Sequence, residues 1–126
     1  IEGASEGKGL GHKFLRHIKR TKTILHCVSL ENEDMAKTYE TVRDELQKYN
    51  PELAEKKEIL ILTKSDTVTP AELKKKITAM KKKNKNIIAV SALDDASIKD
   101  LKDYLIKEMR GLDDAPVLVS TKKEKE

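Results

Sequence analysis

Two short polar segments stand directly after apolar runs, and their side chains could recognise a ligand. Residues 63–66 (Thr-Lys-Ser-Asp) follow the run at 58–62, and residues 91–93 (Ser-Ala-Leu) follow the run at 87–90. Short apolar runs of this kind predict strands that are buried on both faces of a parallel sheet. Both polar segments would then lie at the carboxyl ends of strands, where open α/β sheets bind ligands.

The residue types at these two places fit the edges of a guanine base. The Asp66 carboxylate can accept two hydrogen bonds from the ring and exocyclic N–H groups of guanine, whereas adenine offers no matching pair of donors. The Lys64 stem can lie along the base plane, and the backbone N–H of Ala92 can donate to the guanine carbonyl oxygen. We therefore predict a guanine-binding site that comprises Thr63, Lys64, Asp66, Ser91, Ala92 and Leu93.

The same residues also have ordinary structural interpretations. Asp66 could be a turn aspartate that bonds its own backbone, and Ser91 could cap the start of a loop. A Thr-Lys-x-Asp string is weak evidence when it stands alone. The guanine interpretation is favoured by context, because each segment follows a strand and one helix separates the two segments.

The glycine-rich start of the chain, residues 1–11, lacks the spacing of a phosphate-binding loop. That loop needs four residues between its glycines and Ser or Thr after its Lys. Here three residues separate Gly3 from Gly7, and Gly9 follows Lys8. No predicted strand precedes the segment, so it is not a dinucleotide-binding fingerprint either. We expect a mobile loop.

Strands and helices alternate along the rest of the chain. Apolar runs predict strands near 23–30, 58–62 and 87–91, each followed by a helix with apolar residues three and four apart. This alternation predicts an α/β fold of three layers, with parallel strands and right-handed crossovers. A short amphipathic helix is also expected at 12–20, before the first strand.

Local signals predict where the three later helices begin and end. The first is expected over 32–49 and stops at an Asn-Pro pair. The second begins with Thr69 as its N-cap, followed by Pro and Glu in a capping box. The third is expected to be capped by Ser97 and to stop near Gly111. Its expected apolar positions are Ile98, Leu101, Leu105 and Met109.

Composition limits the functions that the chain can have. Its 126 residues suit one domain, and its net charge of +4 points only weakly to an anionic partner. Aromatic residues make up 3%, which disfavours stacking on exposed bases. Cys27 is the sole cysteine, so an internal disulfide is excluded and a buried thiol is expected. The chain lacks a run long enough to span a bilayer and a signal-peptide pattern, so we expect a cytoplasmic location.

Other candidate chemistry is poorly supported. The three histidines, His12, His17 and His26, have no spacing that suits a metal site, and no nucleophile stands beside a base. The helix from Pro70 is rich in lysine, which predicts a solvated face or, alternatively, a contact with the phosphates of RNA. The lysines concerned are Lys74, Lys75, Lys76, Lys81, Lys82, Lys83 and Lys85.

The start of the chain resembles the Obg-type GTPases. Residues 7–18, with the pattern Gly-x-Gly-Leu-Gly-x-x-Phe-Leu-Arg-His-Ile, are similar to the segment that follows the magnesium-binding Asp-x-x-Gly motif of that family. Residues 1–4 (Ile-Glu-Gly-Ala) and 49–53 (Tyr-Asn-Pro-Glu-Leu) also look like this family. The resemblance extends from residue 1 to about residue 112.

The resemblance implies a Ras-like P-loop NTPase G domain that binds GTP and GDP with Mg²⁺ and hydrolyses GTP slowly. It also implies a role in large ribosomal subunit assembly and stress responses. Thr63, Lys64 and Asp66 match the family's Asn-Lys-x-Asp motif, and Ser91 with Ala92 matches its Ser-Ala motif. The segment 1–11 matches part of the second switch through Glu2, Gly3, Gly7, Gly9 and Gly11.

The chain also departs from the family pattern. Thr63 replaces the usual Asn, so the bracing between loops is expected to be weaker. The phosphate loop, the first-switch threonine and the magnesium aspartate have no counterparts in the sequence. Residues 1–112 are therefore interpreted as the carboxyl-terminal part of a G domain, without catalytic groups of its own.

Two expectations about packing follow from this interpretation. The strand at 23–30 would lack its neighbours in the sheet and would present an open, apolar edge, which favours association. Residues 113–126 end in a charged Lys-Lys-Glu-Lys-Glu run, and we expect them to be a disordered tail.

Two alternatives stay open. The chain could be an RNA- or ribosome-interaction module that uses its lysines and binds no nucleotide. It could also be a flavodoxin-like enzyme, but the acidic segment 31–34 (Glu-Asn-Glu-Asp) after the first strand would repel a phosphate there.

Overall fold

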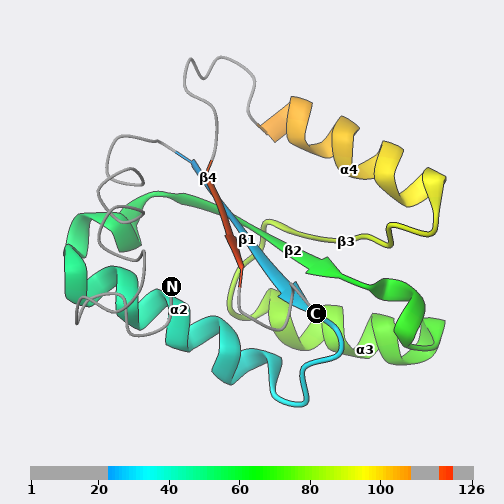
Figure 1. Ribbon diagram of the computed structural model, residues 1–126, viewed down its shortest axis with the longest axis horizontal. Coiled ribbons are helices and arrows are strands. Elements are labelled where there is room, and N and C mark those ends of the chain that lie inside the picture. The colour runs from blue at the N-terminus through cyan, green and yellow to red at the C-terminus, as the bar shows by residue number, and fades with distance from the viewer. Residues whose placement is uncertain (1–22, 109–116, 121–126) are drawn as a thin grey trace.

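The computed structural model describes residues 23–108 and 117–120, which form a parallel sheet with helices on both faces (Figure 1). The strands are β1 (Thr23–Ser29), β2 (Lys57–Thr63), β3 (Ile87–Ala89) and β4 (Val117–Ser120). The helices are α2 (Met35–Tyr49), α3 (Pro70–Lys81) and α4 (Asp95–Glu108), with short 3-10 turns at Pro51–Glu55 and Ser65–Thr67. The predicted α/β class and parallel strands are confirmed.

The strand order is β3-β2-β1-β4, and all neighbours are parallel. In the central pair, Thr23 lies opposite Lys57 and Ser29 lies opposite Thr63. The β2–β3 pairing continues one residue past the strand, since the Val90 N–H donates to the Leu62 carbonyl at 2.8 Å. The carboxyl ends of β1, β2 and β3 therefore meet at one edge of the sheet.

The fourth strand corrects two expectations. Val117–Ser120 pairs with β1, with Ile24 opposite Val117, so the edge of β1 that was expected to be open is occupied. These four residues also fall within 113–126, which was expected to be disordered, and they instead belong to the sheet. A short apolar run beside a buried strand can pair with it even when charged residues surround the run in sequence.

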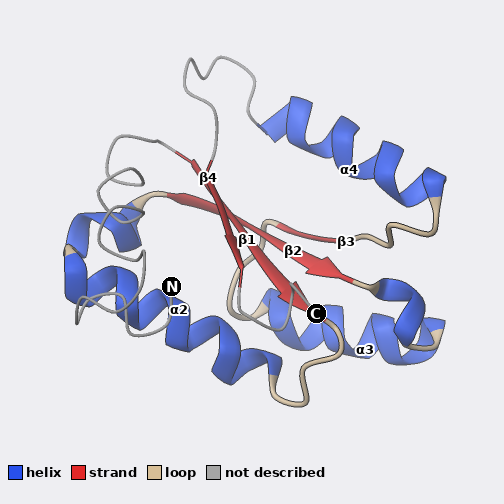
Figure 2. Cartoon of the chain, in the orientation of Figure 1, coloured by secondary structure: helices blue, strands red, loops and turns tan. Residues whose placement is uncertain are grey.

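Helices α2 and α3 lie on one side of the sheet and α4 lies on the other (Figure 2), and an apolar layer fills the space on each side. On one face, α2 and α3 pack over Val28, Leu60 and Leu62. On the other face, α4 packs over Leu25, Ile59 and Ile61, and the Cys27 side chain is buried there, as expected. All seven residues of β1 are buried, which explains its continuous run of mainly apolar residues.

Helix α2 follows its predicted periodicity, but it begins three residues later than expected. Its buried positions include Met35, Tyr39, Val42 and Leu46, at the spacing of one helical face. Asp34 is the N-cap, because its Oδ1 accepts a hydrogen bond from the Lys37 N–H at 3.0 Å.

Helix α3 has the predicted start. Thr69 Oγ1 accepts a hydrogen bond from the Glu72 N–H at 3.2 Å, and Pro70 occupies the first turn. Leu73 and Ile77 pack against the core, and Met80 is buried in it.

The predicted cap of the last helix is wrong. Helix α4 begins at Asp95, and Asp94 Oδ1 accepts from the Ala96 N–H at 3.1 Å. Ser97 Oγ instead accepts from the Ser91 N–H at 3.0 Å, so this hydroxyl holds the loop after β3. The expected helix at 12–20, the switch-like segment 1–11, and the positions Met109 and Gly111 lie outside the described residues.

Candidate functional site

The loop after β2 places the predicted Thr-Lys-x-Asp segment at the carboxyl edge of the sheet. Thr63 is the last residue of β2, and Lys64 follows it in the left-handed region, with φ 58° and ψ 44°. The Ser65 N–H donates to the Val90 carbonyl at 3.1 Å, and the Thr67 N–H donates to the Lys64 carbonyl at 3.0 Å. The backbone therefore turns sharply at Lys64 and presents Asp66 next to the loop after β3.

The structure brings the two predicted segments together through Asp66 and Ser91. Ser91 Oγ donates to Asp66 Oδ1 at 2.7 Å and accepts from the Leu93 N–H at 3.1 Å. Ser91 is only 2% exposed, whereas Asp66 is exposed. The hydroxyl therefore fixes one carboxylate oxygen, and the carboxylate still faces solvent.

Ala92 and Leu93 lie beside this contact on the surface. Leu93 is 82% exposed. Within residues 23–108 and 117–120, the backbone N–H of Ala92 has no hydrogen-bond acceptor. A donor N–H, a carboxylate and an apolar side chain therefore lie at the ends of β2 and β3, where the sequence predicted them.

The sequence did not indicate Glu31 as a neighbour of the predicted site, although it contacts Lys64 from the loop after β1. Lys64 Nζ donates to Glu31 Oε1 at 2.6 Å, and Glu31 belongs to the loop after β1. The sequence alone indicates the acidic segment 31–34 only as a source of repulsion for phosphate. Its position directly after the first strand could have predicted this place, because the carboxyl ends of neighbouring parallel strands meet at one edge of the sheet.

A second polar cluster, also unpredicted, lies under α2 and centres on Glu58. Glu58 Oε2 accepts from His26 Nδ1 at 3.0 Å, and Oε1 accepts from the Tyr39 hydroxyl at 2.5 Å and from Arg43 Nη1 at 2.8 Å. The Tyr39 ring stacks on His26 at 4.9 Å between centroids. An ionised carboxylate only accepts, so His26 carries a proton on Nδ1.

The environment of this cluster shifts two pKa values. Burial acts to raise the pKa of Glu58, but the hydrogen bonds from His26 and Tyr39 and the charge of Arg43 outweigh burial and hold it below the usual value. Burial and the Glu58 carboxylate raise the pKa of Tyr39. The arrangement stabilises an ionised Glu58 beside a protonated phenol.

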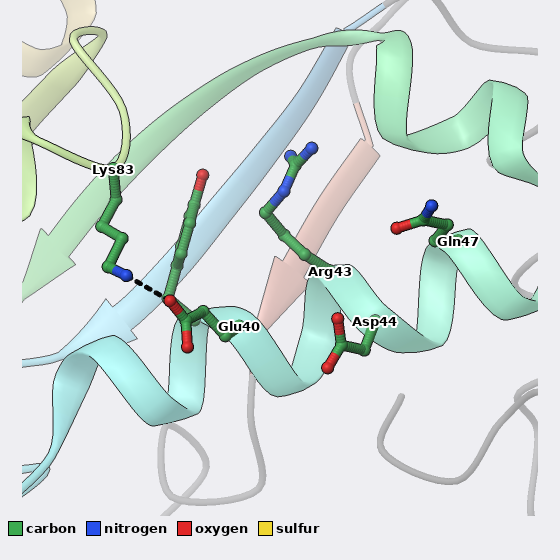
Figure 3. Close-up of a pocket in the computed structure, with 6 residues that line it drawn as sticks. Glu40, Arg43, Asp44, Gln47 and Lys83 are labelled. Atoms are coloured by element: carbon green, nitrogen blue, oxygen red, sulfur yellow. Dashed lines mark hydrogen bonds and ion pairs between the residues drawn. The ribbon is translucent and has the colours of Figure 1, made fainter.

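A shallow hollow of about 360 Å³ opens above this cluster, between α2 and the turn after α3 (Figure 3). Lys83 points across it and bonds to Glu40. Arg43 also lines it but is committed to Glu58 and, through Nη2, to the Ala54 carbonyl at 2.9 Å. Both cations that line the hollow therefore already have anionic or carbonyl partners.

The described residues 23–108 and 117–120 contain no group of three His, Cys, Asp or Glu side chains that could hold a metal ion. The same residues include no helix with the length and apolar character to span a membrane.

A parallel α/β sheet with these loops at its carboxyl edge is consistent with part of a P-loop GTPase domain. The chain is 41% identical over 107 residues to a protein named GTPase Obg from Pelagibacter ubique. It is 44% identical over 109 residues to GTPase Obg from Parabacteroides distasonis. These alignments cover 84% and 86% of this chain. No protein-family profile matches it.

These similarities identify the chain as one part of an Obg-type GTPase, which confirms the resemblance found in the sequence. The alignments cover 33% and 28% of the two relatives, so the chain spans about a third of their length.

Proposed function

We propose that the chain supplies the guanine-binding part of a GTP- and GDP-binding site. The contact between Ser91 Oγ and Asp66 Oδ1, at 2.7 Å, is the observation that carries this proposal. It holds an exposed carboxylate at the carboxyl edge of the sheet while leaving that carboxylate room to accept two N–H groups from a base. Guanine presents such a pair of donors, and adenine does not.

The neighbouring residues complete the proposed contact with the base. The Lys64 stem would cover one face of the ring, and the Ala92 N–H would donate to the guanine carbonyl oxygen. Two further residues border the proposed site: Thr63 is the last residue of β2, and Leu93 is an exposed apolar side chain. Affinity for the base alone should be millimolar or weaker. Two charge-assisted hydrogen bonds contribute about 1.5–3 kcal/mol each, and association costs at least about 4 kcal/mol.

GTP hydrolysis is proposed to be an activity of the whole family member rather than of this chain by itself. No residue of the proposed site is placed to activate a water, and the chain is expected to show no GTPase activity alone. The switch-like residues Glu2, Gly3, Gly7, Gly9 and Gly11 are proposed to act with the phosphate-binding groups that the sequence lacks.

A titration with GDP, followed through the amide NMR spectrum, tests the proposed site, with ADP as the control ligand. We expect GDP alone to shift Lys64, Asp66 and Ala92. Asp66→Asn should remove these shifts, because an amide places a donor where guanine also donates. Asp103→Asn, an equal change on the exposed side of α4, should keep them. Equal shifts with GDP and ADP, or unchanged binding by Asp66→Asn, would contradict the proposal.

A second candidate function is an interaction with RNA, such as ribosomal RNA in the large ribosomal subunit. It is favoured by the exposed lysines of α3 and the turn after it, which are Lys74, Lys75, Lys81, Lys82, Lys83 and Lys85. Closely spaced cations on one element bind phosphates and release counterions. A role in ribosome assembly in the cytoplasm would combine both functions.

Charge reversal separates the two functions. Replacing Lys74, Lys75, Lys81 and Lys82 by Glu should abolish binding to a structured RNA and leave GDP shifts unchanged. Asp66→Asn should show the opposite pattern. RNA binding that survives the charge reversal, or that does not weaken with added salt, would exclude this surface.

A further inference from the structure

Glu31 brings the loop after β1 into contact with the proposed guanine site. Its Oε1 accepts a hydrogen bond from Lys64 Nζ at 2.6 Å, across 33 positions of sequence. The Glu31 side chain is 50% exposed and that of Lys64 is 33% exposed, so both border solvent. The ion pair therefore lies at the surface of the sheet edge, where a ligand could reach the Lys64 stem.

The backbone at both ends of this ion pair is held in place. The Leu30 N–H donates to the Thr63 carbonyl at 3.0 Å, which extends the β1–β2 ladder to the residues next to the contact. The Glu31 N–H donates to Ser29 Oγ at 3.1 Å. Glu31 thus extends from an ordered turn, and its carboxylate meets a lysine whose own backbone is fixed in a left-handed turn.

The ion pair and the Ser91 contact brace the proposed site from two sides. Glu31 holds Lys64 from the loop after β1, and Ser91 holds Asp66 from the loop after β3. A free lysine loses much rotamer freedom when its stem is laid along a ring. An ion pair that already restrains the stem reduces the entropy lost when the base arrives.

We propose that Glu31 is a positioning residue for the guanine site, which acts by holding the Lys64 stem where it covers the base. This inference rests on the proposed function, and it assigns to the acidic loop a role opposite to simple repulsion of the nucleotide. Since Lys64 neutralises the Glu31 carboxylate, the net charge of the pair is near zero. Discrimination between guanine and adenine stays with Asp66.

The first test needs no nucleotide. ¹⁵N relaxation of the Lys64 amide and side-chain ammonium is compared between the wild type and Glu31→Gln. Glu33→Gln is the matched control, because it removes the same charge from an exposed site in the same loop. We expect Lys64 to become more mobile only in Glu31→Gln. Equal mobility in the three proteins would overturn the positioning role.

The second test measures GDP affinity by NMR titration. Glu31→Gln should weaken GDP binding by roughly two- to fivefold, the range of exposed ion pairs, and Glu33→Gln should not. In a Lys64→Met background, which keeps an apolar stem without the ammonium, Glu31→Gln should have no further effect. An additive effect in that background would overturn the proposal, because Glu31 would then act without Lys64.

The two hypotheses fail in different ways. If GDP and ADP bind the wild type equally, the guanine site itself is contradicted, and the role of Glu31 in it falls as well. If the wild type selects GDP and Glu31→Gln binds GDP as tightly as the wild type does, only the role of Glu31 is contradicted.

Discussion

Two carboxylates organise two polar regions of this molecule, and their surroundings differ sharply. Glu58 lies under α2, is 7% exposed, and accepts hydrogen bonds from His26, Tyr39 and Arg43. Asp66 lies at the carboxyl edge, is exposed, and accepts one from Ser91 within the described residues. The first carboxylate is nearly saturated by the protein, whereas the second is held but retains accepting capacity.

The difference distinguishes a structural role for Glu58 from the binding role proposed for Asp66. A buried carboxylate must be compensated by donors inside the fold, so Glu58 joins β1, β2 and α2 and retains little capacity to accept further hydrogen bonds. An exposed carboxylate contributes little to stability, because water competes for its hydrogen bonds. We therefore expect changes at Glu58 to appear in the free energy of unfolding, and changes at Asp66 to appear in ligand binding.

The largest expected effect is the loss of stability in Glu58→Ala. The change leaves the Tyr39 hydroxyl, His26 Nδ1 and Arg43 Nη1 without their acceptor, and we expect a loss of about 3 kcal/mol in the free energy of unfolding. Urea denaturation followed by circular dichroism measures it. Glu58→Gln, which keeps one acceptor oxygen, gives a smaller loss and a measurable midpoint if the Ala variant does not fold.

The matched change on the other side of the comparison is Asp66→Ala. We expect its free energy of unfolding to stay within about 0.5 kcal/mol of the wild type. A loss at Asp66 as large as that at Glu58 would show that the edge carboxylate is also structural, and the contrast between the two regions would be wrong.

A smaller effect is expected in the pH dependence of stability. The pKa of Glu58 is lower in the folded chain than its usual value of 4.5. Its contribution is therefore fully present above that value, and it is lost as the pH falls through the lowered pKa. The wild type should lose stability more steeply than Glu58→Gln below pH 4.5. Parallel pH profiles of the two proteins, measured by urea denaturation, would contradict this assignment.

Local patterns predicted most of the fold, and the missing parts depended on contacts distant in sequence. The apolar spacing of α2 and the Thr69 cap of α3 are local signals, and both helices formed where expected to within a few residues. Strand β4 pairs with β1 from about ninety residues away, and its four residues carry no signal that outweighs the charges around them.

The same distinction holds for the polar residues. The segments at the ends of β2 and β3 were found because strand ends are visible in a sequence. Glu58 and His26 stand 32 positions apart inside buried strands, and neither pattern alone indicates the other. Glu31 stands out in the sequence only by its charge. Its contact with Lys64 depends on the register between β1 and β2, which the sequence does not show.

The sharpest test of the comparison is Lys64→Gly, which should affect stability far less than Glu58→Ala does. Lys64 is the only non-glycine residue with positive φ within residues 23–108 and 117–120, and glycine adopts this conformation without steric cost. The strain relieved offsets the loss of an exposed ion pair, so we expect stability to stay equal or rise by up to about 1 kcal/mol. GDP binding should weaken, because the side-chain stem proposed to cover the base is gone. If Lys64→Gly is as stable as the wild type but binds GDP more weakly, Lys64 serves the ligand rather than the fold. If it is less stable than the wild type and its GDP shifts are unchanged, Lys64 is a structural residue like Glu58.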